Sequence, residues 1–201
     1  MKNKYLKGFL MILLAVIFIA FFFVMSIMDL TNKDDVHETK IDAAGQLLVV
    51  ENSINGIIPT GKDYYYIGMN EDSGEIYTIH AGKNWLKKNF DSDGMAKGNG
   101  VKIKGLSKSA GDYEVRDEIA SRVNQIKAEL GGTFVLESGN VLELNYVQDS
   151  IVRLIAGTLL IALIILGFAA TKRKEAFPAW FGKAVAVVTV LAMVFVIVVI
   201  F

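Results

Sequence analysis

Three long apolar runs constrain this chain more than any other feature of its sequence. Residues 8–28 contain no charged side chain, and comparable runs occupy residues 151–170 and 184–201. A helix rises about 1.5 Å per residue, so roughly 20 apolar residues cover the roughly 30 Å hydrocarbon core of a bilayer. The runs therefore predict three membrane-spanning helices.

The first run resembles both a membrane anchor and a secretory signal peptide. A signal peptide has an apolar region of usually about 7–15 residues, followed by a cleavage site with the pattern small-x-small. Here the run is longer, and its exit, Ser26-Ile-Met-Asp-Leu30, contains no such site. The length and the missing site favour an uncleaved anchor.

Basic residues next to the apolar runs predict the orientation of the chain. Lysine and arginine are enriched on the cytoplasmic side of membrane helices. The topology determinants are Lys2, Lys4, Lys7, Lys172, Arg173, Lys174 and Lys183. They place the N-terminus and the loop 171–183 in the cytoplasm, with the C-terminus and residues 31–150 outside the plasma membrane.

The predicted domain organisation follows from these spans. Residues 1–30 form the cytoplasmic N-terminus and first helix, residues 31–150 an extracytoplasmic domain, and residues 151–201 a helical hairpin. Arg153 is the only charged residue within the predicted spans. It is expected to extend toward the membrane surface or to pair with Asp149. Such spans lack the buried acids of ion pathways and proton relays, which argues against a channel or pump.

Composition restricts the chemistry of the segment between the first two spans. Residues 31–150 contain 13 Lys and Arg against 19 Asp and Glu, which argues against nucleic-acid binding. The chain has no cysteine, so disulfides and cysteine-ligated metals are excluded. His37 and His80 are its two histidines, too few for a zinc site without added carboxylates. We therefore expect no cofactor and no metal.

Local patterns predict an α+β domain with a mainly antiparallel sheet. After a polar connector, 32–42, alternating or β-branched runs favour strands, with a turn region at 52–62. Residues 113–130 carry an apolar stripe with helical spacing, capped at its start by Asp112. Predicted strands are 46–51, 64–69, 75–80, 101–106, 133–137 and 141–147, and predicted helices are 83–90 and 113–130. Strand 64–69 is expected to form a hairpin with 75–80, and strand 133–137 is expected to form a second hairpin with 141–147.

Four tyrosines form a possible binding surface: Tyr64, Tyr65, Tyr66 and Tyr77. Because side chains alternate along a strand, Tyr64 and Tyr66 should face one side of the sheet and Tyr65 the other. Exposed tyrosines are favoured at protein interfaces, whereas buried ones would pack the sheet. Both interpretations remain open from sequence.

Three segments, Tyr64-Tyr-Tyr-Ile-Gly-Met69, Val101-Lys-Ile-Lys-Gly-Leu-Ser107 and the helix that follows, resemble uncharacterised small bacterial membrane proteins of unknown function. The resemblance implies no activity.

The function predicted from sequence is non-enzymatic. Residues 56–63 fall one residue short of the phosphate-binding pattern G-x-x-x-x-G-K-[ST], because Asp63 replaces the hydroxyl that binds Mg²⁺. The leading hypothesis is an accessory or scaffolding subunit, embedded in the lipid bilayer, whose outer domain binds another membrane or envelope protein. One alternative is a receptor-like module for an envelope polymer or solute, and another is an envelope hydrolase.

Overall fold

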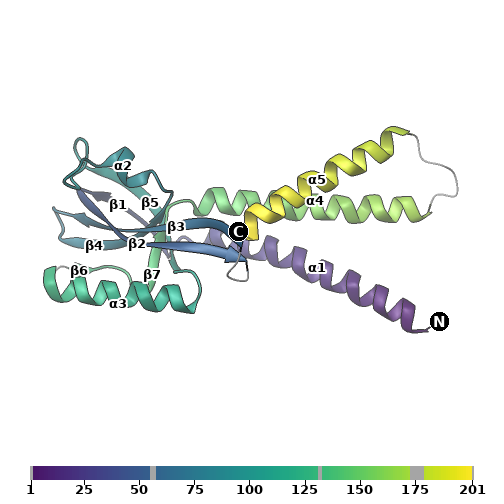
Figure 1. Ribbon diagram of the computed structural model, residues 1–201, viewed down its shortest axis with the longest axis horizontal. Helices are drawn as coiled ribbons and strands as arrows, with labels where there is room; N and C mark the ends of the chain where they lie inside the picture. The colour runs from purple at the N-terminus through teal and green to yellow at the C-terminus, as the bar shows by residue number, and fades with distance from the viewer. Residues whose placement is uncertain (1, 55–57, 131–132, 173–178, 201) are drawn as a thin grey trace. The chain divides into compact units, whose positions relative to one another are not determined.

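The computed structural model describes residues 2–54, 58–130, 133–172 and 179–200 (Figure 1). The chain divides into two compact units. Unit 1 comprises residues 1–31 and 147–201, and unit 2 comprises residues 32–146. The domain boundaries predicted from sequence were 31 and 150.

Unit 1 is helical. Helices α1 (Lys2–Thr31), α4 (Tyr146–Lys172) and α5 (Ala179–Ile200) contain the three apolar runs. Within the described residues, only Tyr146–Leu166 forms a helix long and apolar enough to cross a membrane. The apolar helical stretches Val16–Thr31 and Phe181–Val194 are shorter, in the range of 10–17 residues.

The predicted fold class, three transmembrane α-helices plus an α+β domain with a mainly antiparallel sheet, is therefore wrong: the described residues contain one candidate span rather than three, and the sheet is a mixed one of seven strands. Each apolar run does form a helix, but a helix of apolar residues is not in itself a membrane span.

Helices α1 and α4 pack together through a narrow seam. On α1 the buried side chains of Ile19, Phe22, Ser26 and Asp29 recur at spacings of three and four, as expected for one helix face. On α4 the backbone approaches closely at Gly157, where an added Cβ would lie 2.7 Å from Phe23. At one end of this seam, Arg153 Nη2 lies 2.5 Å from Asp29 Oδ2. Arg153 also donates to the Asp149 backbone carbonyl.

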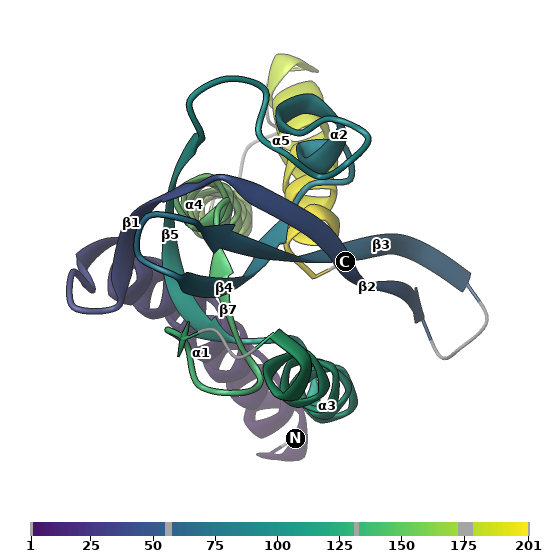
Figure 2. The same ribbon diagram turned by 90° about the vertical axis from the view of Figure 1, so that its left-hand side faces the viewer.

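Unit 2 is a mixed seven-stranded sheet with helices on both faces (Figures 1 and 2). The strand order is β1-β5-β7-β4-β3-β2, with β6 beside β4. The strands are β1 (Val36–Ile41), β2 (Ala43–Ile54), β3 (Ile58–Asn70), β4 (Glu75–Ala81), β5 (Val101–Ser109), β6 (Thr133–Phe134) and β7 (Asn140–Glu143). The helices of this unit are α2 (Trp85–Asn89) and α3 (Tyr113–Leu130).

Two apolar cores lie on opposite faces of the sheet. On the first face Tyr66, Ile79 and Leu142 pack with Phe90 at the end of α2. On the second face Tyr65 and Val141 pack with Ile119 and Val123 of α3. The predicted helix 113–130 is confirmed to the residue, and Asp112 Oδ1 caps it by accepting the Val115 amide at 3.0 Å.

Three strand predictions differ from the structure. The polar connector contains β1, which pairs antiparallel with β5. The predicted turn region 52–62 continues as paired strand on both sides of residues 55–57, which lie outside the described residues. The predicted hairpin 133–147 is wrong, because β6 and β7 each pair in parallel with β4 and Tyr146 already begins α4. The errors at β1 and at 133–147 concern pairing with strands distant in sequence, whereas the error at 52–62 concerns pairing between the neighbouring strands β2 and β3.

Candidate functional site

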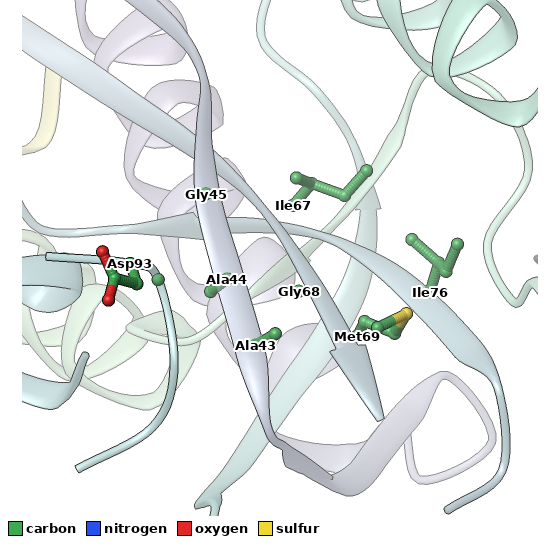
Figure 3. Close-up of a pocket in the computed structure, with 9 residues that line it drawn as sticks. Ala43, Ala44, Gly45, Ile67, Gly68, Met69, Ile76 and Asp93 are labelled. Carbon is green, nitrogen blue, oxygen red and sulfur yellow. The ribbon is translucent and has the colours of Figure 1, made fainter. Parts of the chain in front are cut away.

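One end of the sheet in unit 2 carries an open apolar pocket (Figure 3). The cavity has a volume of about 180 Å³. It is lined by Ala43, Ala44, Gly45, Ile67, Gly68, Met69, Ile76, Asp93 and Gly94. The register of β2 against β3 pairs Ala43 with Met69 and Gly45 with Ile67, which puts these residues on one face of the sheet.

Small residues on β2 create the space. A Cβ built on Gly45 would meet Ile67 Cγ2 at 3.9 Å, an ordinary van der Waals contact, as its nearest neighbour. A larger side chain at position 45 would therefore enter the cavity without a clash at its Cβ. Ala43 and Gly45 thus lower the sheet surface beneath the pocket.

The loop from Asp91 to Ala96 forms the side wall. Asp91 Oδ1 accepts hydrogen bonds from the amides of Asp93 and Met95 at 3.0 and 2.9 Å. The Ala44 amide donates to the Gly94 carbonyl at 2.8 Å, which ties the loop to β2. Gly94 has a φ of +80°, and a Cβ there would lie 2.6 Å from the Ala44 carbonyl oxygen, so this wall requires glycine. The wall is preformed by backbone hydrogen bonds.

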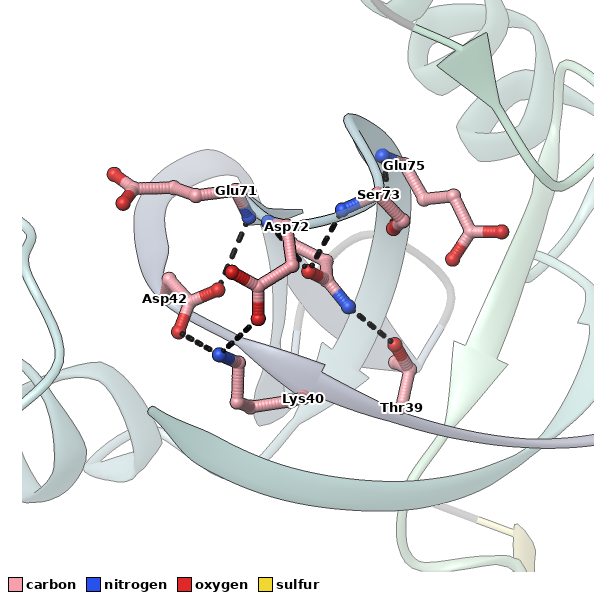
Figure 4. Close-up of polar contacts among 8 residues, drawn as sticks. Thr39, Lys40, Asp42, Glu71, Asp72, Ser73 and Glu75 are labelled. Carbon is pink, nitrogen blue, oxygen red and sulfur yellow. Dashed lines mark hydrogen bonds and ion pairs between the residues drawn. The ribbon is translucent and has the colours of Figure 1, made fainter. Parts of the chain in front are cut away.

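A polar rim of Lys40, Asp42, Glu71 and Asp72 lies at the β1–β2 corner and the β3–β4 turn, close in sequence to the pocket residues Ala43 and Met69 (Figure 4). Lys40 Nζ lies 3.1 Å from Asp42 Oδ1 and 2.6 Å from Asp72 Oδ2. The hydrogen bonds to Asp72 and then Asp42 raise the pKa of Lys40. The amide of Glu71 donates to Asp42 Oδ2 at 3.0 Å, which fixes the turn against the corner.

The rim also encloses a second, polar hollow. Its volume is about 300 Å³, and it is lined by Lys40, Asp42, Glu71, Met95, Ala96, Gly98, Asn99 and Gly100. Within the part of the chain that the structure describes, the carboxylates of Glu71 and Asp93 make no hydrogen bond or ion pair. Lys40 is already engaged by two carboxylates, so the rim offers negative charge to a ligand.

A second titratable cluster lies elsewhere on the sheet. His80 on β4 lies between Asp63 of β3 and Glu143 of β7, with Nδ1 hydrogen-bonded to Glu143 and Nε2 3.6 Å from Asp63 Oδ1. The Tyr65 ring stacks on the imidazole with centroids 4.8 Å apart. Asn52 donates to the other Asp63 oxygen at 2.9 Å, so the cluster crosses four strands.

The two carboxylates control the charge of His80. Burial lowers its pKa, but the hydrogen bonds and negative charges of Asp63 and Glu143 outweigh burial and raise the pKa to about 10. The hydrogen bond to His80 lowers the pKa of Asp63 in turn. At neutral pH His80 is therefore an imidazolium with both ring nitrogens protonated, and it offers no lone pair to a metal or to a proton in transfer.

No group of three His, Cys, Asp or Glu side chains suited to a metal ion occurs among the described residues. Asn70 and Asp91, in two acidic turns of unit 2, use their side chains locally. The Asn70 side-chain oxygen accepts the amides of Asp72 and Ser73, and Asp91 binds its own loop. These contacts form ordinary turns.

Three of the four tyrosines proposed as a binding surface are interior. Tyr65, Tyr66 and Tyr77 are 3%, 1% and 4% exposed, and Tyr64 is half-buried. Their alternation agrees with the prediction, since Tyr66 belongs to the core on the α2 side and Tyr65 to the core on the α3 side. Burial removes these three rings from the available surface.

The structure describes five of the seven basic residues that were used to predict the orientation of the chain. Lys2, Lys4 and Lys7 belong to α1, and Lys172 is the last residue of α4. Lys183 is exposed on α5, whereas Arg173 and Lys174 lie outside the described residues.

Sequence reasoning missed the pocket and its rim. The available signal was the Ala43-Ala44-Gly45 run together with the glycine-rich loop 91–100, but nothing local indicates that these two segments meet. Comparison with family models, curated proteins and solved structures found no match.

Proposed function

We propose that this chain is a non-enzymatic, membrane-attached accessory protein, and that unit 2 binds another membrane or envelope protein. The observation that carries the proposal is the open apolar pocket together with the carboxylates of Glu71 and Asp93, which have no polar partner among the described residues. Concave apolar sites with a few placed polar groups are the usual form of a recognition site. The interior position of Tyr65, Tyr66 and Tyr77 removes from the surface three of the four tyrosines on which the receptor-like alternative relied.

Attachment to the bilayer is supported by the helical unit. The α4 segment Tyr146–Leu166 has the length and composition of a membrane helix. Large apolar side chains point outward from it, among them Ile151, Ile155, Ile161 and Ile165. Exposed apolar surface on this scale is typical of lipid or protein contact. We propose the plasma membrane as the site of attachment.

Charge around α4 supports the side on which unit 2 lies. Unit 2 precedes α4, and the basic run Lys172-Arg-Lys174 follows the apolar stretch. Basic residues at the end of a membrane helix favour the cytoplasmic side. The proposal therefore places unit 2 on the extracytoplasmic side.

Photocrosslinking in native membranes tests this function. A photoreactive phenylalanine derivative at Met95, an exposed position beside the rim, should give a discrete adduct with one membrane or envelope protein in carbonate-washed membranes. The same derivative at Tyr113, the exposed first residue of α3, is the matched control and should not give that adduct. Identical products from both positions would contradict a binding function. Loss of the chain from the membrane fraction during washing would contradict attachment.

A further inference from the structure

The size of the pocket restricts what can fill it. Pockets for drug-sized ligands usually measure about 300–1,000 Å³. The apolar pocket measures about 180 Å³ and is open on one side. Its apolar walls include Ile67, Met69 and Ile76. A single aliphatic side chain from a larger partner matches this volume and chemistry better than a whole small molecule.

The pocket is ready to bind without rearrangement. Its floor is paired β-sheet, and its wall is held by the Ala44–Gly94 backbone hydrogen bond and by Asp91. A preformed site avoids the entropy cost of ordering a loop when the ligand arrives. One anchoring side chain can therefore contribute a large share of the binding free energy, as at interface hot spots.

The negative charge near the pocket restricts which partner residues can lie beside that aliphatic side chain. Asp93 lies at the pocket, and Glu71 lies at the adjoining hollow; neither carboxylate has a polar partner among the described residues. Lys40, which lines the same hollow as Glu71, is held by Asp42 and Asp72. A positively charged residue of the partner would complement this rim, whereas an acidic one would be repelled.

We propose that the pocket binds one aliphatic side chain of an extended partner-protein segment, while Glu71 and Asp93 bind a lysine or arginine beside it. This inference rests on the binding function proposed above, and it specifies the site and the partner chemistry. The partner motif is thus an aliphatic residue with an adjacent basic residue.

Labelled peptides provide a direct test on the full chain in detergent micelles. Three fluorescein-labelled probes separate the contribution of the aliphatic residue from that of the basic residues. The first, Ser-Lys-Leu-Lys-Ser, contains both; the second, Ser-Lys-Ser-Lys-Ser, lacks the aliphatic residue; and the third, Ser-Glu-Leu-Glu-Ser, has acidic in place of basic residues. Fluorescence anisotropy should detect binding of the first probe, with at least about tenfold weaker binding of the other two. Equal binding of all three probes, or of none, would overturn the proposal.

A variant that fills the cavity tests whether the aliphatic side chain of the probe binds in the apolar pocket. The substitution Gly45→Leu places a side chain in the pocket at a position whose Cβ has room. It should weaken binding of the Ser-Lys-Leu-Lys-Ser probe by at least about tenfold. Gly82→Leu adds the same side chain at a glycine with open space around its Cβ, away from the pocket, and should leave binding unchanged. Equal effects of the two variants would overturn the assignment.

Removal of negative charge from the rim tests the proposed binding of a basic residue by Glu71 and Asp93. These substitutions do not disturb the interior of the protein. The double variant Glu71→Gln/Asp93→Asn should weaken binding severalfold and reduce its dependence on salt. The matched control Asp117→Asn/Glu137→Gln removes two exposed acids elsewhere and should do neither. An unchanged salt dependence in the rim variant would refute the role of Glu71 and Asp93.

The two proposals can fail separately. A Met95 photoadduct that persists in Gly45→Leu would support a binding function at another surface and refute the pocket. Peptide binding that follows the expected pattern, without any protein adduct in membranes, would support the pocket chemistry and refute the accessory function.

Discussion

The two units accommodate buried charge in different ways. In unit 1, Arg153 and Asp29 pair between helices from opposite ends of the sequence, with side chains 17% and 9% exposed. In unit 2, His80 lies between two carboxylates on neighbouring strands. An arginine keeps its proton at any ordinary pH, whereas a histidine can lose its charge. The stability contributed by the Arg153–Asp29 pair should therefore be lost when either residue is replaced but should not change with pH. The stability contributed by the His80 cluster should change with pH.

Breaking the helical pair should have the largest effect. Asp29→Leu leaves the buried guanidinium without this carboxylate, and we expect the free energy of unfolding to fall by about 3–5 kcal/mol. Chemical unfolding in detergent micelles, followed by circular dichroism, measures the change.

The double variant Asp29→Leu/Arg153→Met is the control for this prediction. Removing both charges avoids an unpaired ion, so the double variant should be more stable than Asp29→Leu alone. If the single variant is as stable as the double, the ion pair contributes nothing to packing of α1 against α4.

The sheet cluster should give an effect that depends on pH. The folded-state pKa of His80, about 10, lies above the ordinary value of 6.5. Its charge therefore adds stability that is complete below pH 6.5 and is lost as the pH rises to 10. His80→Gln should be less stable than the parent at pH 6.5, and this gap should narrow by at most about 1.4 kcal/mol per pH unit.

Unfolding of parent and variant in parallel from pH 6 to 10.5 measures this gap, because the titration of other groups cancels in the difference. The loss caused by Asp29→Leu should stay constant over the same range, since a guanidinium does not titrate there. A gap for His80→Gln that is independent of pH would show that the imidazole is not charged by its two carboxylates.

An exposed pair should have the smallest effect. Lys62 and Glu51 form an ion pair between β3 and β2, and both side chains are largely open to solvent. The hydrogen bond to Lys62 lowers the pKa of Glu51, but solvent and salt screen exposed charges. Lys62→Met should leave the Tm within measurement error of the parent in a thermal unfolding scan. A clear drop in Tm would mean that this hairpin depends on its surface charges.

Local patterns predicted the elements that depend on neighbouring residues. The helix 113–130 was predicted to the residue, because its apolar stripe and the Asp112 cap both lie within the segment. The hairpin of β3 and β4 was predicted because turn residues separate two β-prone runs. Strand β1 was missed because its sequence, VHETKI, is polar and its stability comes from pairing with β5.

The site was less predictable than the fold. Tyrosine alternation was correct, yet burial of both sheet faces could not be read from β3 and β4 alone, since α2 and α3 provide the covering. The same limit applies to Arg153, whose partner Asp29 lies 124 residues earlier. Contacts across such separations leave no periodic signal.

The sequence by itself determined the three apolar runs, the helix and hairpin of the domain, and the absence of cysteine chemistry, because each depends on composition or short-range spacing. Tertiary structure decided that β6 and β7 run parallel to β4, and that loop 91–96 meets β2 to form a pocket. Those outcomes require segments distant in sequence to pack together. Their free energy belongs to the contact between segments and cannot be assigned to either segment alone.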